Sequence, residues 1–534
     1  MNKNLSKLKM PAMLLFSGIL SAVPLLFPQL GFFQWLSLIP MAIVLIGLVR
    51  EEELKLFKAY LFGIIFYMGY FPVIYHSFLY MYPLDFAGVS NEISLVIVIL
   101  ACFGIAFFQS IFASLGFVAF VAAARTKLVK RIPYLMPIIM AAIWVIVEFW
   151  QTIGWWSQPW GKLAIGQVTF SMLVRSASLF GPYFISFVIV AFNFFLALAI
   201  LKIGVRRIVI AVPMAMFALN LALGVVVTLS YKESDRTVKV AAAQGNISST
   251  EKWDGGYSGI LDVYRKLTED AAADGAEMIL WPETALPYDL EKREDIAEKV
   301  REIAVENNIT ILISAFTEDK ESGMQYNSLY EINSKGEFGK DVYNKQKLVP
   351  FGEFVPMRDL FVTIFPPLAE INMLQSDLKE GEESVVLEGE HGNIGCGICF
   401  DAVYETVTLG AVNNGAEIMA FSSNYSWFKD SRALNMHTAH SQLRAIESGR
   451  YVICSGNTGI SAIIDPLGNV IEETGILERD YVIAEAQLRN DVTLYSIIGN
   501  AVVYLCIGSV IAVFAAEIIV RVKDKESTNP LKRD

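Results

Sequence analysis

Charged residues are scarce in this chain. Asp, Glu, Lys and Arg together make up only 18% of its 534 residues, and hydrophobic residues make up 54%. Soluble domains usually carry about 25% charged residues, so the composition excludes an ordinary soluble protein, while the length allows two or more domains. The net charge of −11 lies mainly in the middle of the chain. It is typical of a solvated extramembrane surface and gives no sign of a nucleic-acid partner.

Cysteine and histidine are also few. Five cysteines are too few for a disulfide scaffold. Cys396 and Cys399 form a CxxC pattern, but residues three apart on a strand point to opposite faces. Neither a second CxxC nor a histidine pair lies nearby in the sequence, so we expect no metal and no cofactor. The four histidines offer no convincing base for a cysteine, which disfavours a papain-like pair: His76, His391, His437 and His440.

Long apolar runs are abundant. A membrane-spanning helix needs about 20 apolar residues. The first run lacks a small-residue cleavage site followed by a soluble start, so it is interpreted as a retained helix rather than a signal peptide. We therefore predict a polytopic α-helical membrane domain of about eight helices, at residues 11–29, 33–49, 58–80, 92–124, 133–152, 178–201, 207–230 and 497–520.

Basic residues predict how these helices cross the membrane. Every second connection is rich in Lys and Arg, and the alternate short connections are nearly free of them, which places the basic ends and both termini in the cytoplasm. We expect three parts: 1–230 with seven helices, 231–495 outside the cytoplasmic membrane, and 496–534 with the last helix and a basic tail. The basic positions include Lys3, Lys7, Lys9, Arg50, Lys55, Lys58, Arg125, Lys127, Lys130, Arg131, Lys202, Arg206, Arg207, Arg521, Lys523 and Lys525.

The segment 231–495 alternates strand-like and helix-like patterns, which predicts a layered α/β fold. In such folds the chemistry gathers where strands end and loops converge. The expected strands are 238–247, 277–282, 309–316, 327–333, 393–400, 417–422, 451–455 and 460–464, and the expected helices are 257–274, 291–307, 403–414 and 435–447.

Three residues near strand ends form a plausible set for covalent catalysis. Cys399 follows a β-leaning apolar run, Glu283 lies in Trp281-Pro-Glu-Thr284, and Lys345 ends Tyr343-Asn-Lys345. A cysteine attacks as thiolate and needs a base, which Glu283 can supply. Lys345 would place positive charge near the oxyanion of a tetrahedral intermediate, and the backbone N–H of Phe400 can donate to the same oxygen.

The order of the motifs and their residues resemble those of a known protein family over nearly the whole chain. The chain resembles the nitrilase (carbon–nitrogen hydrolase) superfamily, whose Glu-Lys-Cys triad occurs in this order. Within it, the chain is similar to the membrane-embedded apolipoprotein N-acyltransferase family. The motifs are Gln244-Gly-Asn-Ile247 with Lys252-Trp253, Trp281–Pro287, Tyr343-Asn-Lys345, Leu348–Pro356, Ser423-Asn424 with Trp427-Phe428, Arg444–Arg450 and Asn457–Ile460.

The resemblance implies an αββα sandwich for the soluble domain and a role for each site residue. Glu283 would be the general base, Lys345 the oxyanion-stabilising amine and Cys399 the nucleophile, with Glu353 orienting the site. The family commonly has Cys-Tyr-Glu where this chain has Cys399-Phe400-Asp401. The acid is therefore kept but shortened, and the phenol hydroxyl is lost.

The family's reaction transfers an acyl chain from a phospholipid to the α-amine of the lipidated N-terminal cysteine of an apolipoprotein. By resemblance we expect a phospholipid donor, a diacylglyceryl apolipoprotein acceptor, a thioester at Cys399, and a multi-pass location in the bacterial cytoplasmic membrane. The apolar segment 354–376 is interpreted as a lid over acyl chains, or as a loop that packs on the domain. The candidate lipid-binding residues, some of which can instead belong to an interfacial aromatic belt, are Trp160, Trp253, Phe354, Asn424 and Trp427.

Two other functions are compatible with parts of the pattern. A membrane-anchored amidase or nitrilase would use the same triad to hydrolyse a carbon–nitrogen bond, and it would act on a soluble amide without phospholipid. A transporter or receptor with an inactivated nitrilase-like sensor would lack a triad residue or carry charges inside its helices. All three triad residues are present, and Glu148 is the main ionisable residue within the helices. Both features disfavour the transporter or receptor. The triad alone does not separate hydrolysis from transfer, but the eight helices and the apolar segment 354–376 favour a lipid substrate, since a small-molecule amidase would need neither.

Overall fold

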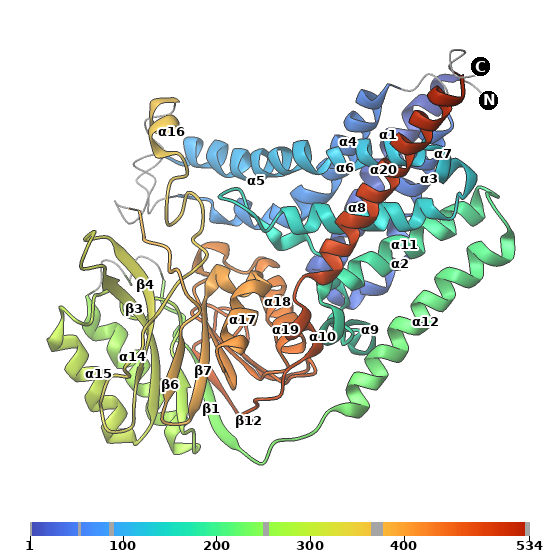
Figure 1. Cartoon of the computed structure of the whole chain (residues 1–534). Helices are drawn as coiled ribbons and strands as arrows, with labels where there is room; N and C mark the ends of the chain where they lie inside the picture. The colour runs from blue at the N-terminus through green and yellow to red at the C-terminus, as the bar shows by residue number, and fades with distance from the viewer. Residues whose placement is uncertain are drawn as a thin grey trace.

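The computed structural model describes residues 3–51, 55–84, 90–248, 252, 256–364 and 377–528. Figure 1 shows a helical region that holds both ends of the chain and an α/β body at the opposite end of the molecule. This arrangement confirms the predicted combination of a polytopic helical region and an α/β domain. The helices that precede the α/β body are α1 (Lys3–Leu26), η1 (Pro28–Phe33), α2 (Gln34–Ser37), α3 (Ile39–Val49), α4 (Leu56–Ile74), η2 (Tyr75–Met81), α5 (Asn91–Ala113), α6 (Leu115–Ala124), α7 (Lys127–Arg131), α8 (Leu135–Trp150), α9 (Ser171–Val174), α10 (Ala177–Phe180), α11 (Pro182–Ile200) and α12 (Arg206–Ser230).

Within the described residues, seven helical segments are long and apolar enough to cross a membrane. The remaining predicted run, 133–152, forms the 16-residue helix α8, which is shorter than a full span. Several predicted runs are interrupted rather than continuous. The run 92–124 divides into α5 and α6 at Ser114, and the run 33–49 breaks at Leu38, whose backbone N–H donates to Asn193 Oδ1 at 3.0 Å. A side-chain acceptor thus replaces a helical hydrogen bond, as the membrane interior requires.

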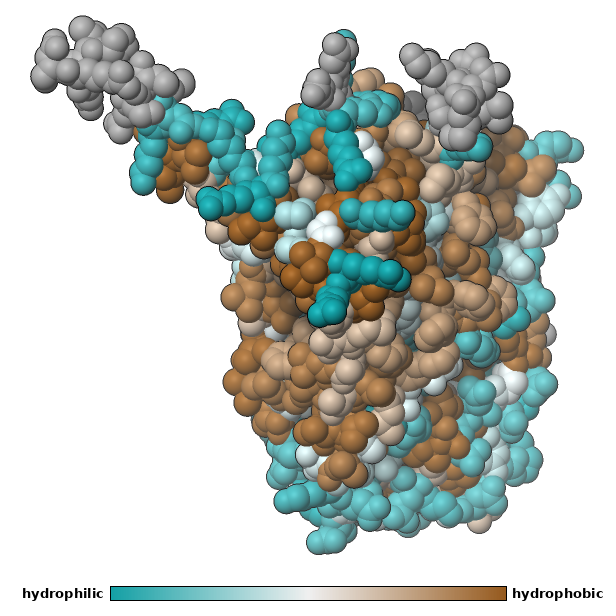
Figure 2. Space-filling view, turned by 90° about the vertical axis from the view of Figure 1, so that its right-hand side faces the viewer, coloured by the Kyte–Doolittle hydropathy of each residue, from teal (hydrophilic) through white to brown (hydrophobic). Residues whose placement is uncertain are grey.

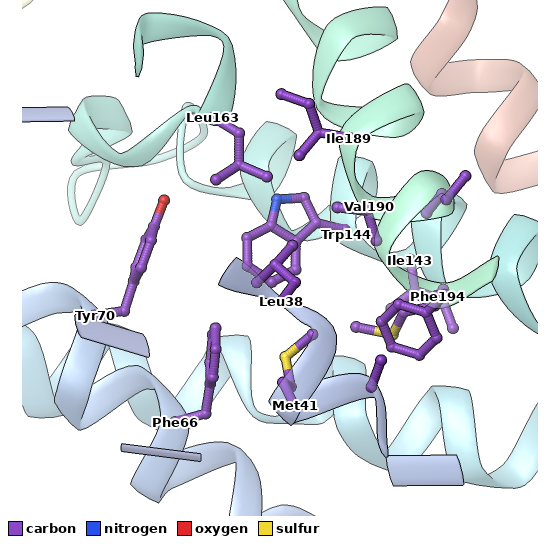
Figure 3. Packing of buried hydrophobic residues seen from close by; sticks show 14 of the residues in the cluster. Leu38, Met41, Phe66, Tyr70, Ile143, Trp144, Leu163, Ile189, Val190 and Phe194 are labelled. Carbon is purple, nitrogen blue, oxygen red and sulfur yellow. The ribbon is translucent and has the colours of Figure 1, made fainter. Parts of the chain in front are cut away.

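Small residues bring the membrane helices into close contact. A Cβ added at Gly18 of α1 would lie 2.2 Å from the carbonyl oxygen of Phe66 in α4, and one added at Gly69 would lie 2.4 Å from that of Leu15. Such close backbone approach is how helices pack without a hydrophobic driving force. Where the helices lie further apart, large side chains fill the space between them. Figure 3 shows Trp144 of α8 among Leu38, Met41, Phe66, Tyr70, Leu163 and Ile189.

The α/β body contains two six-stranded sheets. The first has the order β12–β1–β2–β3–β4–β5 and the second the order β11–β10–β9–β8–β7–β6. In the first sheet the strands are β12 (Asp480–Gln487), β1 (Thr237–Gln244), β2 (Met278–Leu280), β3 (Thr310–Glu318), β4 (Gln325–Ile332) and β5 (Tyr343–Asn344). In the second they are β11 (Val470–Glu473), β10 (Ala462–Ile464), β9 (Val452–Gly456), β8 (Ile418–Ser423), β7 (Gly392–Ile398) and β6 (Val386–Gly389).

Helices cover the outer face of each sheet, which gives four layers. Alternation along β1 illustrates the arrangement: Val238 and Val240 point into the core between the sheets, whereas Ala241 and Ala243 pack under α14 and α15. The second sheet packs against α17 and α18 in the same way. The layers are therefore the predicted αββα sandwich, and its covering helices are α14 (Tyr257–Ala273), α15 (Glu294–Asn307), α17 (Glu405–Asn413) and α18 (Ala433–Ser448). The other helices of this part of the chain are α16 (Arg358–Ile364), α19 (Leu494–Ile498) and α20 (Ala501–Thr528), and α20 holds one of the candidate membrane spans.

The segment between α8 and α11 joins the two parts of the molecule. Its short helices η4 (Pro159–Gly161) and η5 (Leu163–Gln167) lie against α4, α8 and α11 on one side and α18 on the other. Glu148, the charged residue inside α8, accepts hydrogen bonds from Trp144 Nε1 at 2.8 Å and from the backbone N–H of Leu163 at 3.0 Å. Glu148 therefore attaches this segment, defined here as the outer loop (residues 151–181), to the membrane helices.

Candidate active site at the ends of β2, β5 and β7

Cys399 lies in a sharp turn directly after β7. Its φ of +49° is in the left-handed region, which costs a non-glycine residue about 1–2 kcal/mol and is often found at functional sites. Asp401, fully buried, supports the turn: its Oδ2 accepts hydrogen bonds from the Ile398 N–H at 2.9 Å and the Tyr343 hydroxyl at 2.8 Å, and its Oδ1 accepts from the Lys347 N–H at 2.7 Å. The shortened acid thus ties the Cys399 turn to the segment that carries Lys345.

Lys345 follows β5 and is surrounded by carboxylates. Its Nζ donates to Glu283 Oε1 at 3.0 Å and to Glu353 Oε1 at 2.7 Å, with only 1% of the side chain exposed. Asn327 Nδ2 donates to the same Glu283 oxygen at 2.8 Å, and the backbone N–H of Val349 donates to Glu353 Oε2 at 2.8 Å. Burial alone would lower the pKa of Lys345, but the two glutamates raise it well above its usual value. The site therefore holds a permanent cation.

Packing of the two sheets brings Glu283 to Cys399. Glu283 lies three residues beyond β2 in the first sheet, and its backbone N–H donates to the carbonyl oxygen of Ser423 at 3.4 Å in the second sheet. The neighbouring Ser422 donates from Oγ to the Trp281 carbonyl at 3.1 Å, and Ser422 is the register partner of Ile398, the residue before Cys399. The ends of β2, β7 and β8 therefore meet at one point.

The charged residues brought together at this point affect the pKa of the Cys399 thiol. Burial raises the pKa of Cys399 well above its usual value, and the negative charges of Glu283 and Glu353 raise it further, while Lys345 and the backbone N–H of Asn424 act in the opposite direction. The cysteine is therefore a neutral thiol at rest. A nucleophile of this kind needs a base that removes its proton during the attack.

The structure places the remaining predicted residues around this cluster. Phe400 stacks on Trp160 of the outer loop, with ring centroids 5.9 Å apart. Asn424 Oδ1 accepts from Asn457 Nδ2 at 3.2 Å, and Phe354 is half-buried in the turn after Glu353. Trp427 is half-buried in the short helix η8 (Ser426–Phe428) beside η2. Trp253 and much of the predicted lid, residues 365–376, lie outside the described residues.

Three further polar residues reach the site without having been assigned a role from the sequence. Lys252 Nζ donates to the Glu283 carbonyl at 2.8 Å and to Thr284 Oγ1 at 2.6 Å, and burial lowers its pKa to about 7 although Glu283 acts against this shift. Asn327 holds the Glu283 carboxylate, and His437 lies behind the nucleophile turn. Asn327 lies among other polar residues of β4, so its sequence neighbourhood offers no signal for this role.

Comparison with known proteins matches both parts of the chain. Residues 17–195 match the family described as apolipoprotein N-acyltransferase N-terminal domain, and residues 239–492 match the carbon-nitrogen hydrolase family. A protein named apolipoprotein N-acyltransferase from Gloeobacter violaceus is 27% identical over 472 residues, covering 88% of this chain and 87% of its own. The chain belongs to the apolipoprotein N-acyltransferase family. A second member, from Pasteurella multocida, is 25% identical over 512 residues and 92% of each chain.

The two matches account for both halves of the candidate site. Glu283, Lys345, Glu353 and Cys399 all lie within the carbon-nitrogen hydrolase match, whereas Trp160 of the outer loop lies within the match to the N-terminal domain of apolipoprotein N-acyltransferases. The stacking of Trp160 on Phe400 therefore joins the two matched regions next to Cys399.

Proposed function

We propose that this chain transfers an acyl chain from a phospholipid to the α-amine of the lipidated N-terminal cysteine of apolipoproteins, through a thioester at Cys399. The observation that carries the proposal is the buried cluster in which Lys345 bridges Glu283 and Glu353 beside the thiol. Family membership supports the choice of acyl transfer over hydrolysis.

In the first half-reaction Glu283 takes the proton of the Cys399 thiol while the sulfur attacks the ester carbonyl of the phospholipid. The Lys345 ammonium and the backbone N–H of Phe400 stabilise the oxyanion of the tetrahedral intermediate. The protonated Glu283 then gives its proton to the departing alcohol oxygen, so that lysophospholipid leaves and the acyl chain remains on sulfur. Glu353 and Asn327 hold Lys345 and Glu283 in place for both proton transfers.

In the second half-reaction the apolipoprotein amine attacks the thioester. Glu283 accepts a proton from the attacking nitrogen, the same cation and N–H hold the oxyanion, and the carbon–sulfur bond breaks as the amide forms. The thiolate of Cys399 recovers its proton from Glu283, which returns the site to its starting state. The ester and the amine react in turn, so the kinetics are ping-pong.

A membrane location brings both lipidated substrates to the same surface. In Figure 2 hydrophobic residues dominate the middle of the visible face, and hydrophilic residues gather at its upper and lower ends. Both termini lie at the end away from the α/β body (Figure 1), which is consistent with basic cytoplasmic connections. We therefore place residues 231–495 on the extracytoplasmic side of the bacterial cytoplasmic membrane, between seven helices of 1–230, which are six long segments and the shorter α8, and the last helix in 496–534.

Mass spectrometry of the purified chain tests the proposal directly. After incubation with phospholipid vesicles, we expect an acyl adduct on Cys399 that a diacylglyceryl peptide with a free amine discharges as amide. Cys399→Ala should form none. Cys396→Ala removes a buried core cysteine three residues away and should still form the adduct. Turnover of phospholipid without any adduct on wild-type protein, or turnover of a soluble amide without phospholipid, would contradict the thioester transferase.

Glu283→Gln should separate the ionisation of the thiol from its reactivity. Removing the negative charge takes away a cause that raises the pKa of Cys399, so the pH midpoint of alkylation by iodoacetamide should move downward. Acyl-enzyme formation should nevertheless slow by about 10²–10⁴-fold, because the general base is lost. The matched control is Glu331→Gln, whose carboxylate raises the pKa of Cys396 rather than that of Cys399. An unchanged acylation rate in Glu283→Gln would exclude Glu283 as the base.

A further inference from the structure

His437 lies directly behind the nucleophile turn, and the half-reactions above do not use it. It comes from α18, and its side chain is almost fully buried. Its Nε2 lies 2.9 Å from the backbone carbonyl oxygen of Cys399, and its Nδ1 is hydrogen-bonded to the buried hydroxyl of Tyr425. Two buried side chains thus form a chain of hydrogen bonds that ends on the backbone of the nucleophile.

The chemistry of the partners determines the direction of both hydrogen bonds. A carbonyl oxygen can only accept, so Nε2 of His437 must carry the hydrogen. Burial lowers the pKa of His437 to about 3, so the ring is neutral near pH 7 and Nδ1 has a free lone pair. The Tyr425 hydroxyl therefore donates to Nδ1, and Nε2–H donates to the Cys399 carbonyl. The Tyr425 bond selects the tautomer that the second bond requires.

The nucleophile needs such support because its backbone conformation is unfavourable. With φ at +49°, Cys399 would relax toward the common right-handed or extended regions if its peptide carbonyl were free. That rotation would carry the thiol away from Glu283 and Lys345. Trp160 of the outer loop packs against the imidazole at 5.9 Å between centroids and also stacks on Phe400. The ring of His437 is thus in contact with both Trp160 and Tyr425.

We propose that His437 is a positioning residue, whose Nε2–H bond to the Cys399 carbonyl, directed by Tyr425, holds the nucleophile in its left-handed conformation. The inference rests on the proposed function, since the conformation matters only if the thiol reacts. It assigns no proton transfer to His437. The side chain acts on the reaction only through the backbone of Cys399.

Two substitutions at one position separate the hydrogen bond from the packing. His437→Phe fills the space but cannot donate, and it should slow acyl-enzyme formation by about 100-fold, as expected when a reacting group is displaced by about 1 Å. Its KM for phospholipid should be unchanged. His437→Gln places an amide N–H near the position of Nε2 and should remain within about tenfold of wild type, since one imperfect hydrogen bond is at stake. Rates come from mass spectrometry of the adduct, and the thermal unfolding of each variant is measured in the same detergent.

The outcomes distinguish failure of this inference from failure of the proposed function. If wild-type Cys399 takes up no acyl chain, the proposed function fails. If wild type is acylated and His437→Phe is equally fast, the positioning role is excluded. It is also excluded if folded His437→Gln is as slow as His437→Phe. Should His437→Phe not fold, Tyr425→Phe decides: acylation about threefold to tenfold slower, the loss of one hydrogen bond, supports the inference, and the wild-type rate overturns it.

Discussion

Replacing Lys345 by methionine should both destabilise the protein and stop acyl transfer. The substitution leaves Glu283 and Glu353 buried without the cation that lies 3.0 and 2.7 Å from them. Breaking a buried pair by removing one partner costs about 3–5 kcal/mol, and the oxyanion loses its strongest partner, which should slow acyl-enzyme formation by about 10²–10³-fold. Denaturant unfolding in detergent micelles measures the first effect, and mass spectrometry of the Cys399 adduct measures the second.

A second substitution distinguishes the two consequences. In Lys345→Met with Glu353→Gln, only one of the two carboxylates remains, so a large part of the lost stability should return while acylation stays slow. Lys347→Met is the matched control, because its ammonium pairs at 3.5 Å with the exposed Glu380 and surface pairs contribute little. Full stability in Lys345→Met, or recovery of acylation in the double variant, would contradict the role given to Lys345.

Local patterns were sufficient to predict a layered α/β fold, whereas the αββα sandwich was implied by the family resemblance. Apolar runs and amphipathic periods correctly predicted most strands and all four of the expected helices of the α/β body. The strand β12 was not predicted, because Asp480–Gln487 mixes charged and apolar residues and only two of its positions are fully buried. Its strand character comes from its long antiparallel pairing with β1, a tertiary interaction that a local pattern does not record.

The site was predictable only where motifs mark it. Glu283, Lys345 and Cys399 follow recognisable runs, and the structure brings them together. The residues that hold them come from distant segments: Asn327 lies 44 positions from Glu283, and His437 lies 38 positions from Cys399. From the sequence, His437 was considered only as a base for the cysteine and was disfavoured, since nothing in its sequence neighbourhood points to Cys399. Only the packing of α18 against β9, β10 and the turn after β7 brings its imidazole to the nucleophile.

The outer loop offers a second large effect, at the junction between the membrane helices and the α/β body. Lys162 of this loop forms a buried ion pair with Glu405 at the start of α17, with 1% of each side chain exposed. Arg444 lies 3.8 Å from the same carboxylate, and the Tyr183 hydroxyl donates to it at 2.7 Å. The nucleophile turn lies immediately before Glu405 in the chain, so this ion pair holds that turn against the membrane region.

Lys162→Met should therefore lower the free energy of unfolding by about 3 kcal/mol at pH 7 and slow acylation.

The effect of this substitution should depend on pH. Burial alone would raise the pKa of Glu405, but Lys162 and Arg444 hold it at about 2, below the ordinary 4.5. The contribution of this carboxylate to stability is thus complete above pH 4.5 and is lost as the pH falls toward 2. In Lys162→Met the pKa of Glu405 rises, because Arg444 and Tyr183 remain but the lysine is lost. The stability difference from wild type should therefore narrow between pH 7 and pH 4, as this carboxylate takes up a proton. Lys127→Met, which removes an exposed pair with Asp524, should change nothing measurable. A pH-independent difference would mean that lost packing, not the unpaired charge, causes the instability.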